Sequence, residues 1–269
     1  MNKFLSSTER YINENQYVNS LPRRIDDARK PRLPCAFSIR KIIALRLYLV
    51  LSCIKNYPRQ LWIGRDRLLE SIRFGKSCAR KRCIVIGNGP SQGYLDATRL
   101  NLFTEKGGET ICVNHWDQNE TLSAHVPTWL VLSDPLTLKL GERSASLVAY
   151  LLAHPTIKIV VPPDLIRPLC DVRLSNKIYT FVDVELPIFG GINPFLPRGY
   201  VSMTLYKALA WALYLNYSQI GVIGMDNTYP RNIFCDNSNR ILNLECHAGT
   251  EDYVNDYTSL YPSIECILE

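Results

Sequence analysis

A loop with two glycines follows the first short apolar run of the main domain, and its composition is typical of a phosphate-binding turn. Residues 83–86 lead directly into Gly87, Asn88, Gly89, Pro90 and Ser91. Glycines allow a ligand to approach the backbone closely, and a proline followed by a serine suits the start of a helix, where N–H groups attract an anion. The loop lacks the third glycine of a dinucleotide fingerprint and the Gly-Lys-Ser/Thr of a P-loop. It therefore predicts phosphate or nucleotide binding, with an ordinary strand-to-helix turn as the alternative.

Three more polar side chains stand where strands of a parallel sheet would end. Asn114, Asp134 and Asp226 each come within three residues of the end of a short apolar run. Ligands of such sheets bind at the carboxyl ends of the strands. Asn114 could therefore contact a sugar or a base, and the two aspartates could accept hydrogen bonds from hydroxyl groups. Each of the three could instead cap a turn or a helix.

The chain has four histidines, and His247 is the candidate general base because it lies in a loop that precedes the last predicted helix. An imidazole suits that role near neutral pH, although a lone loop histidine is more often a surface residue. The nine cysteines form no Cys-x-x-Cys pair, so we predict reduced thiols and no metal site.

Apolar runs alternate with helical patterns along the part of the chain that follows residue 80. The predicted strands are 83–86, 110–113, 129–132, 157–161, 177–182, 219–223 and 264–268, and the clearest predicted helices are 142–152, 201–215 and 253–260. Short apolar strands separated by helices favour parallel pairing with both faces of the sheet covered. We predict an α/β, Rossmann-like fold with a mostly parallel sheet and helices on both faces, plus a basic N-terminal helical extension.

Composition is that of a globular protein, with 269 residues, 46% hydrophobic and 21% charged, but the charge is unevenly distributed. Residues 23–82 carry roughly 17 Lys or Arg and 4 Asp or Glu, which gives this segment a net charge of about +13. The whole chain has a formal net charge of +6, so the rest of the chain is net acidic by about 7. We predict a polar arm at 1–37, a basic amphipathic helical extension at 38–80 that is interrupted at Pro58, and an α/β domain at 81–269. The most apolar stretch, 42–54, is about 13 residues long and contains Arg46, too short and too polar to cross a bilayer.

The basic segment 23–82 predicts a polyanionic partner, for which nucleic acid and an anionic membrane are the usual candidates. Nucleic acid is disfavoured because no binding motif is present. Two interpretations of the helical extension remain open and are compatible: it packs on the main domain with a solvated basic face, or it lies on anionic lipid. The N-terminus has no apolar core of a signal peptide, so we expect a cytoplasmic protein, peripheral on the inner face of the cytoplasmic membrane.

Several segments, in this order along the chain, resemble the bacterial lipooligosaccharide sialyltransferases. Residues 84–91, Ile-Val-Ile-Gly-Asn-Gly-Pro-Ser, are similar to the first strand and loop of that family, and residues 112–114, Cys-Val-Asn, to its second strand. Residues 208–226 are similar to a later helix, turn and strand that end in Gly-x-Asp, and His247 is placed like the family's catalytic histidine. The resemblance covers roughly residues 82–268. The Gly-Asn-Gly-Pro-Ser loop is shared with a wider Rossmann-like group that includes pterin pyrophosphokinase-like enzymes.

The resemblance implies a glycosyltransferase that uses a CMP-activated sugar, normally CMP-sialic acid, and a glycan or glycolipid acceptor. No metal would be obligatory, although a divalent cation could stimulate the reaction. Asn88 and its flanking glycines would hold the phosphate and ribose, Asn114 the nucleotide, and Asp226 the ribose or base. Tyr229 would hydrogen-bond the leaving phosphate, and His247 would deprotonate the acceptor hydroxyl.

Departures from the family pattern leave the donor sugar open. Asp134 stands where the family has an asparagine, and Ser202 or Thr204 would have to bind the carboxylate of a sugar acid. The lid at 227–247 is short and has no second tyrosine between Tyr229 and His247. The donor could be another CMP-linked acid such as Kdo, or a different nucleotide sugar. Two alternatives share the loop: a nucleotide-processing enzyme of the pterin pyrophosphokinase-like group and a non-catalytic nucleotide-binding protein.

Overall fold

The structure is a computed structural model, and its description covers most of the chain between residues 39 and 256. The described residues are 39–76, 80–119, 122, 124–134, 141–172, 174–186, 191–199, 203–226, 233–235, 241–245 and 253–256. The chain divides into two compact units, one of residues 49–226 with 248–250 and one of residues 1–48, 227–247 and 251–269. The candidate loop and the strand-end residues up to Asp226 belong to the first unit.

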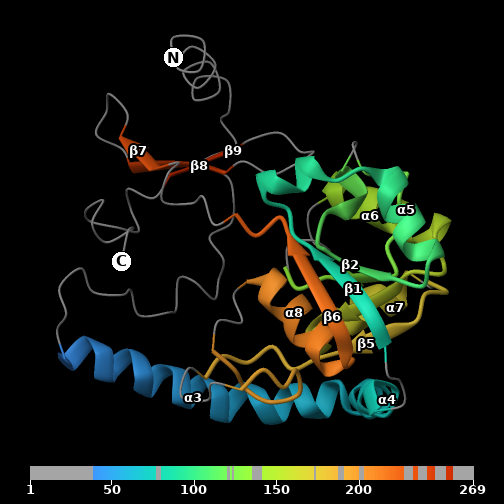
Figure 1. Ribbon diagram of the computed structural model, residues 1–269. Helices are drawn as coiled ribbons and strands as arrows, with labels where there is room; N and C mark the ends of the chain where they lie inside the picture. Colours follow the sequence, from blue (N-terminus) through green and yellow to red (C-terminus); the bar gives the residue numbers. More distant parts are fainter. Residues whose placement is uncertain are drawn as a thin grey trace. The chain divides into compact units, whose positions relative to one another are not determined.

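The first unit is built on a sheet of six strands in the order β5-β4-β3-β2-β1-β6, and every pair of neighbours is parallel (Figure 1). The strands are β1 (Arg80–Ile86), β2 (Glu109–Val113), β3 (Trp129–Val131), β4 (Lys158–Val161), β5 (Ile178–Thr180) and β6 (Tyr217–Ile223). This arrangement confirms the predicted α/β, Rossmann-like class. Each of these strands overlaps a predicted apolar run.

Helices cover both faces of this sheet, and alternate side chains of each strand point to opposite faces. Val85, Ile111 and Val131 pack with Trp211 of α8, whereas their neighbours along the strands face the other way. One face is covered by α4 (Arg65–Lys76) and α8 (Thr204–Tyr214), and the other by α5 (Ala97–Glu105), α6 (Gly141–Ala153) and α7 (Ile166–Asp171) (Figure 1). Short 3₁₀ turns lie at Pro90–Tyr94, Trp116–Gln118 and Pro163–Leu165.

The strand order places a topological switch point between β1 and β6. Strands β1 to β5 follow one another across the sheet, and the chain then crosses back through α8 to add β6 on the free side of β1. In parallel α/β sheets, ligands bind outside the carboxyl ends of the strands at such a point. A ligand site is therefore expected at the loop that follows β1 and the turn that follows β6.

The predicted break at Pro58 is wrong, because α3 runs from Ile39 to Ile63 with Pro58 inside it. Pro58 has no N–H for the carbonyl four residues earlier, but both Pro58 and Ile54 are exposed, so water can solvate that carbonyl. Gly64 separates α3 from α4, and a Cβ added to it would lie 3.0 Å from the Pro163 side chain. The chain then continues as α4.

Both helices contribute side chains to the first unit's core. Cys53 of α3 and Leu68 of α4 are buried in the same cluster as residues of β1 to β5. The Ser71 hydroxyl accepts a hydrogen bond of 2.9 Å from the backbone N–H of Thr180, at the end of β5. The interpretation that this basic region packs on the main domain is therefore confirmed for residues 49–76.

The second unit contains a small antiparallel sheet in the order β7-β8-β9, formed by Ile233–Cys235, Ile241–Glu245 and Tyr253–Asp256. The predicted helix 253–260 is wrong for its described part, since residues 253–256 form β9. Tyr253 and Val254 are strand-favouring residues that pair with Glu245 and Leu244 of β8. The predicted arm 1–37 and strand 264–268 lie outside the described residues.

None of the helices in the described ranges combines enough length with enough apolar character to cross a membrane.

Candidate functional site

The loop after β1 is bonded directly to the turn after β6. The backbone N–H of Gly87 donates to the carbonyl of Ile223 at 2.8 Å, and that of Gly89 donates to the carbonyl of Gly224 at 3.0 Å. The Ser91 hydroxyl accepts from the N–H of Gly224 at 2.9 Å. These bonds extend the pairing of β1 and β6 beyond the strands and hold two segments of the switch point together.

Two glycines are required here by the approach of the two loops. A Cβ added to Gly87 would overlap the backbone of Gly224, and one added to Gly224 would overlap the backbone of Gly87. Gly224 also has a φ of +73°, which L side chains rarely adopt. The sequence suggested that glycine lets a ligand approach the loop; in the structure, glycine lets another part of the same chain approach it.

The side chain of Asp226 is hydrogen-bonded to the same loop. One of its carboxylate oxygens, Oδ2, accepts a hydrogen bond of 2.7 Å from the backbone N–H of Ser91, in the turn Pro90–Tyr94. The N-cap residue of this turn is Gly89 rather than Asp226, which bonds to the start of the turn from a distant position in the chain. A carboxylate has two oxygens, so Oδ1 can still accept from a ligand hydroxyl. The negative charge next to Ser91 opposes the binding of a phosphate at that N–H and favours a neutral group that donates.

The half-buried side chain of Asn88 is a polar group of the loop that these bonds do not use. The N–H groups of Gly87, Gly89 and Ser91 are bonded within the chain, and that of Gln92 donates to the carbonyl of Gly89 at 3.0 Å. The Asn88 amide can both donate and accept. The Asn88 side chain is therefore a candidate ligand contact within loop 87–91.

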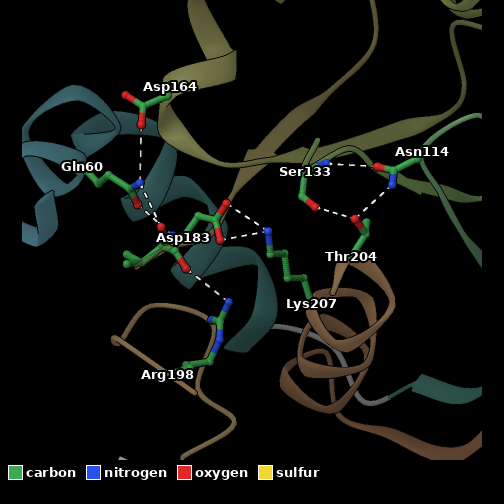
Figure 2. Close-up of polar contacts among 9 residues, drawn as sticks. Gln60, Asn114, Ser133, Asp164, Asp183, Arg198, Thr204 and Lys207 are labelled. Atoms are coloured by element: carbon green, nitrogen blue, oxygen red, sulfur yellow. Dashed lines mark hydrogen bonds and ion pairs between the residues drawn. The ribbon is translucent and has the colours of Figure 1, made fainter. Parts of the chain in front are cut away.

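A second polar group of three residues joins the ends of β2 and β3 to the start of α8 (Figure 2). Asn114 donates through Nδ2 to the Thr204 hydroxyl at 3.0 Å and accepts through Oδ1 from the backbone N–H of Ser133 at 3.3 Å. The hydroxyls of Ser133 and Thr204 are 2.6 Å apart. Asn114 has a φ of +46°, a strained conformation that asparagine tolerates better than most residues and that is found often at functional sites.

Ser133 is the member of this group that was assigned no site role from the sequence, although it stands at one of the strand ends where a ligand was expected. It is buried, it lies immediately before Asp134, and it follows the apolar run that forms β3. Its position at a strand end was the signal that could have identified it, but only its neighbour Asp134 was assigned a site role. Asp134 itself is half-buried at the same strand end.

Beyond this group, a charged pair is buried beneath the start of α8. Lys207 is 4% exposed and its ammonium group lies 2.9 Å and 3.0 Å from the two carboxylate oxygens of Asp183 (Figure 2). Gln60 of α3 accepts from the backbone N–H of Asp183 at 2.7 Å and donates to its carbonyl at 3.2 Å, which ties α3 to the segment after β5.

Arg198 adds a second buried cation close to this pair. It is 1% exposed, and its two terminal nitrogens donate to the backbone carbonyls of Asn193 and Val182, each at 3.2 Å. Burial lowers the pKa of the Arg198 guanidinium, and the charges of Asp183 and Tyr206 partly oppose that change. Arg198 and Gln60 donate to backbone carbonyls of the segment between β5 and α8, so their role is to hold the conformation of that segment.

His125 is a buried histidine with a structural role. Its Nδ1 lies 2.7 Å from the side-chain oxygen of Asn101, and its Nε2 lies 2.9 Å from the Thr110 hydroxyl. Because the oxygen of Asn101 can only accept, Nδ1 carries the proton and Nε2 accepts from Thr110. Burial lowers the pKa of His125 to about 4, so the ring is neutral near pH 7.

Three predicted site residues, Ser202, Tyr229 and His247, lie outside the described residues. The structure brings the other predicted residues to the carboxyl edge of one sheet, where all but Asp134 belong to two bonded groups. One group joins loop 87–91 to Asp226, and the other joins Asn114 to Thr204. Within the described ranges, no group of three or more His, Cys, Asp or Glu side chains is arranged to hold a metal ion.

Comparisons with known proteins returned no match: no family model, no curated protein and no solved structure is significantly similar to this chain.

Proposed function

We propose that the chain is a glycosyltransferase that takes its sugar from a nucleotide-activated donor, with a CMP-linked sugar acid as the first candidate. One observation carries the proposal: Asn88, Asp226 and the Asn114–Ser133–Thr204 group lie at the carboxyl edge of a parallel sheet, beside its switch point. This edge offers amides, hydroxyls and the carboxylates of Asp226 and Asp134, which are groups that recognise a nucleoside.

In this proposal the ribose and the phosphate bind at different parts of the edge. Asp226 accepts from ribose hydroxyls through the oxygen that Ser91 does not use, and Asn88 bonds the base or the sugar. The phosphate lies toward the N-terminus of α8, where the helix dipole favours negative charge and the carboxylate of Asp226 does not oppose it. Asp134, which follows the Ser133 that contacts Thr204, is the carboxylate that counts against an anion there. This division explains why a loop with few unused N–H groups can still belong to a nucleotide site.

The reaction that follows needs a base and a stabilised leaving group. In the proposal His247 takes the proton of the acceptor hydroxyl, the acceptor oxygen bonds to the anomeric carbon, and the bond from that carbon to the CMP phosphate breaks. Tyr229 donates a hydrogen bond to the phosphate of the departing CMP. Ser202 or Thr204 binds the carboxylate of the sugar acid. These roles rest on the resemblance to the sialyltransferases.

Two measurements test the proposal together. Calorimetry with CMP, UDP, GDP and ATP identifies the nucleotide, and the release of CMP from CMP-sialic acid or CMP-Kdo in the presence of a glycan acceptor reports transfer. We expect CMP to bind and wild-type protein to release CMP, and His247→Ala to bind CMP but lose at least about a hundredfold in transfer rate.

Other results would replace the proposal. Tight binding of ATP without binding of CMP would favour the pterin pyrophosphokinase-like alternative. Binding of CMP with no turnover of any CMP-sugar would favour a non-catalytic nucleotide-binding protein. Full activity of His247→Ala on an authentic acceptor would remove that residue from the mechanism.

A further inference from the structure

One side of α3 exposes a row of large apolar side chains that is separate from the candidate site. The row, here the α3 stripe, consists of Leu51 (58% exposed), Ile54 (65%), Leu61 (38%) and Trp62 (80%). At roughly 100° per residue, these four positions fall within about 100° of the helix surface. Ile43 and Leu47, which are also exposed, lie on the same line toward the start of the helix.

The α3 stripe is not the face by which α3 packs on the sheet. That face is formed by Cys53, which is buried, by the partly buried Val50 and Tyr57, and by Gln60 with its bonds to Asp183. The helix therefore has two apolar faces, and one of them is covered within the first unit. Contiguous exposed apolar patches of this kind mark interaction sites, whereas single exposed apolar residues are ordinary.

Basic side chains flank the stripe on α3 itself. Lys55 is exposed next to it on α3, and Arg46 is exposed on its other side. Arg65 and Arg73 are exposed on α4, with the exposed Leu69 midway between them at a spacing of four residues, although α4 also exposes Asp66 and Glu70. An apolar face with an exposed tryptophan and flanking cations is the pattern of helices that lie in the interface of an anionic membrane.

We propose that the α3 stripe docks this protein on an anionic lipid surface, with Trp62 and its apolar neighbours entering the headgroup region. From Leu51 to Trp62 the stripe is about 17 Å long, shorter than the hydrocarbon core, so the helix lies in the plane of the membrane. A second copy of the chain is a poorer occupant, because stacking two stripes would bring their flanking cations together. Docking on lipid is independent of the proposed transferase activity.

Tryptophan fluorescence of the full chain tests this directly, because Trp62 is the only exposed residue among the four tryptophans and Trp116, Trp129 and Trp211 are buried. Vesicles of phosphatidylcholine mixed with phosphatidylglycerol should shift the emission to the blue, and brominated lipid should quench it. Vesicles of phosphatidylcholine alone should have little effect. Trp62→Phe should remove the shift while the protein still sediments with the mixed vesicles.

A charged double variant tests the stripe itself. Leu51→Glu with Ile54→Glu should lower partitioning onto the mixed vesicles by at least about tenfold. The matched control is Leu152→Glu, at a residue of α6 that is 54% exposed, and it should partition like wild type. Lys55→Glu with Arg65→Glu should weaken binding to the mixed vesicles by about tenfold as well.

Three outcomes would overturn the proposal: unchanged partitioning of the Leu51→Glu, Ile54→Glu variant, equal binding to vesicles of phosphatidylcholine alone, or a dimer in sedimentation analysis without lipid that this variant converts to a monomer. Thermal unfolding and CMP binding of each variant separate loss of docking from loss of the fold. They also separate it from failure of the proposed transferase function.

Discussion

The Asp226 carboxylate accepts a hydrogen bond of 2.7 Å from the backbone N–H of Ser91, so the residue that follows β6 holds the loop that follows β1. The two residues are 135 positions apart in the sequence. A carboxylate in this place explains how the loop is kept in position, and it gives the switch point one acceptor that a ribose hydroxyl can use.

Replacing Asp226 separates these two roles. Asp226→Asn keeps an acceptor oxygen for Ser91, so its free energy of unfolding should stay within about 1 kcal/mol of wild type, whereas Asp226→Ala should lose about 1–2 kcal/mol. If the other oxygen binds ribose, both variants should bind CMP about tenfold more weakly, as measured by calorimetry. Wild-type affinity in Asp226→Asn would limit this residue to holding the loop.

Gly224 should not tolerate a side chain. Gly224→Ala combines a positive φ with overlap against the backbone of Gly87, and we expect a loss of about 3 kcal/mol or more in unfolding by urea. Gly93 is the matched control, since an added Cβ there meets no atom within 4 Å and its φ is ordinary. Gly93→Ala should change stability by less than about 1 kcal/mol. Similar stabilities for the two variants would contradict the close approach of the two loops.

Two ion pairs of different burial should differ in their contribution to stability. Lys207→Met leaves the Asp183 carboxylate without its buried partner and should cost about 3 kcal/mol. Arg59 also pairs with an aspartate, Asp164, at 2.9 Å, but the two side chains are 58% and 39% exposed. Arg59→Met should therefore cost less than about 1 kcal/mol. Chemical denaturation of both variants at pH 7 measures the difference, and equal losses would argue against burial as its cause.

The stability of the protein should fall in mild acid because of His125. Its pKa is lowered from 6.5 to about 4 in the folded protein, so between these values the unfolded chain binds a proton that the folded chain does not. The free energy of unfolding should be unaffected by this group above pH 6.5 and should fall by about 1.4 kcal/mol per pH unit toward pH 4.

Comparison of wild type with His125→Gln isolates this effect, because the amide has no proton to gain in this range. Urea unfolding at pH 7 and at pH 5 should show a loss for wild type that exceeds the loss for the variant by about 2 kcal/mol. Equal losses would mean that His125 is protonated in the folded protein.

The fold class was predictable because the relevant signals are local. Residues 83–86 and 110–113 are short, mostly apolar runs that become buried inner strands of the parallel sheet, whereas 219–223 lies in the edge strand β6, most of whose residues after Tyr217 are exposed. The helices near 142–152 and 201–215 were predictable for the same reason, since their apolar positions repeat with the period of a helix. Pro58 misled the prediction because the cost of a proline depends on whether water can reach the carbonyl left without a partner.

The sequence by itself therefore determined the parallel α/β sheet and the strand ends at which Asn88, Asn114 and Asp226 would stand. Only the tertiary structure decided what these residues contact. It joined Ser91 to Asp226 and Ser133 to Thr204, it buried Lys207 against Asp183, and it left Trp62 exposed on α3. The physical reason is that hydrophobic periodicity is written in neighbouring residues, whereas a hydrogen bond between residues 135 positions apart depends on strand order and loop geometry, which no local pattern encodes.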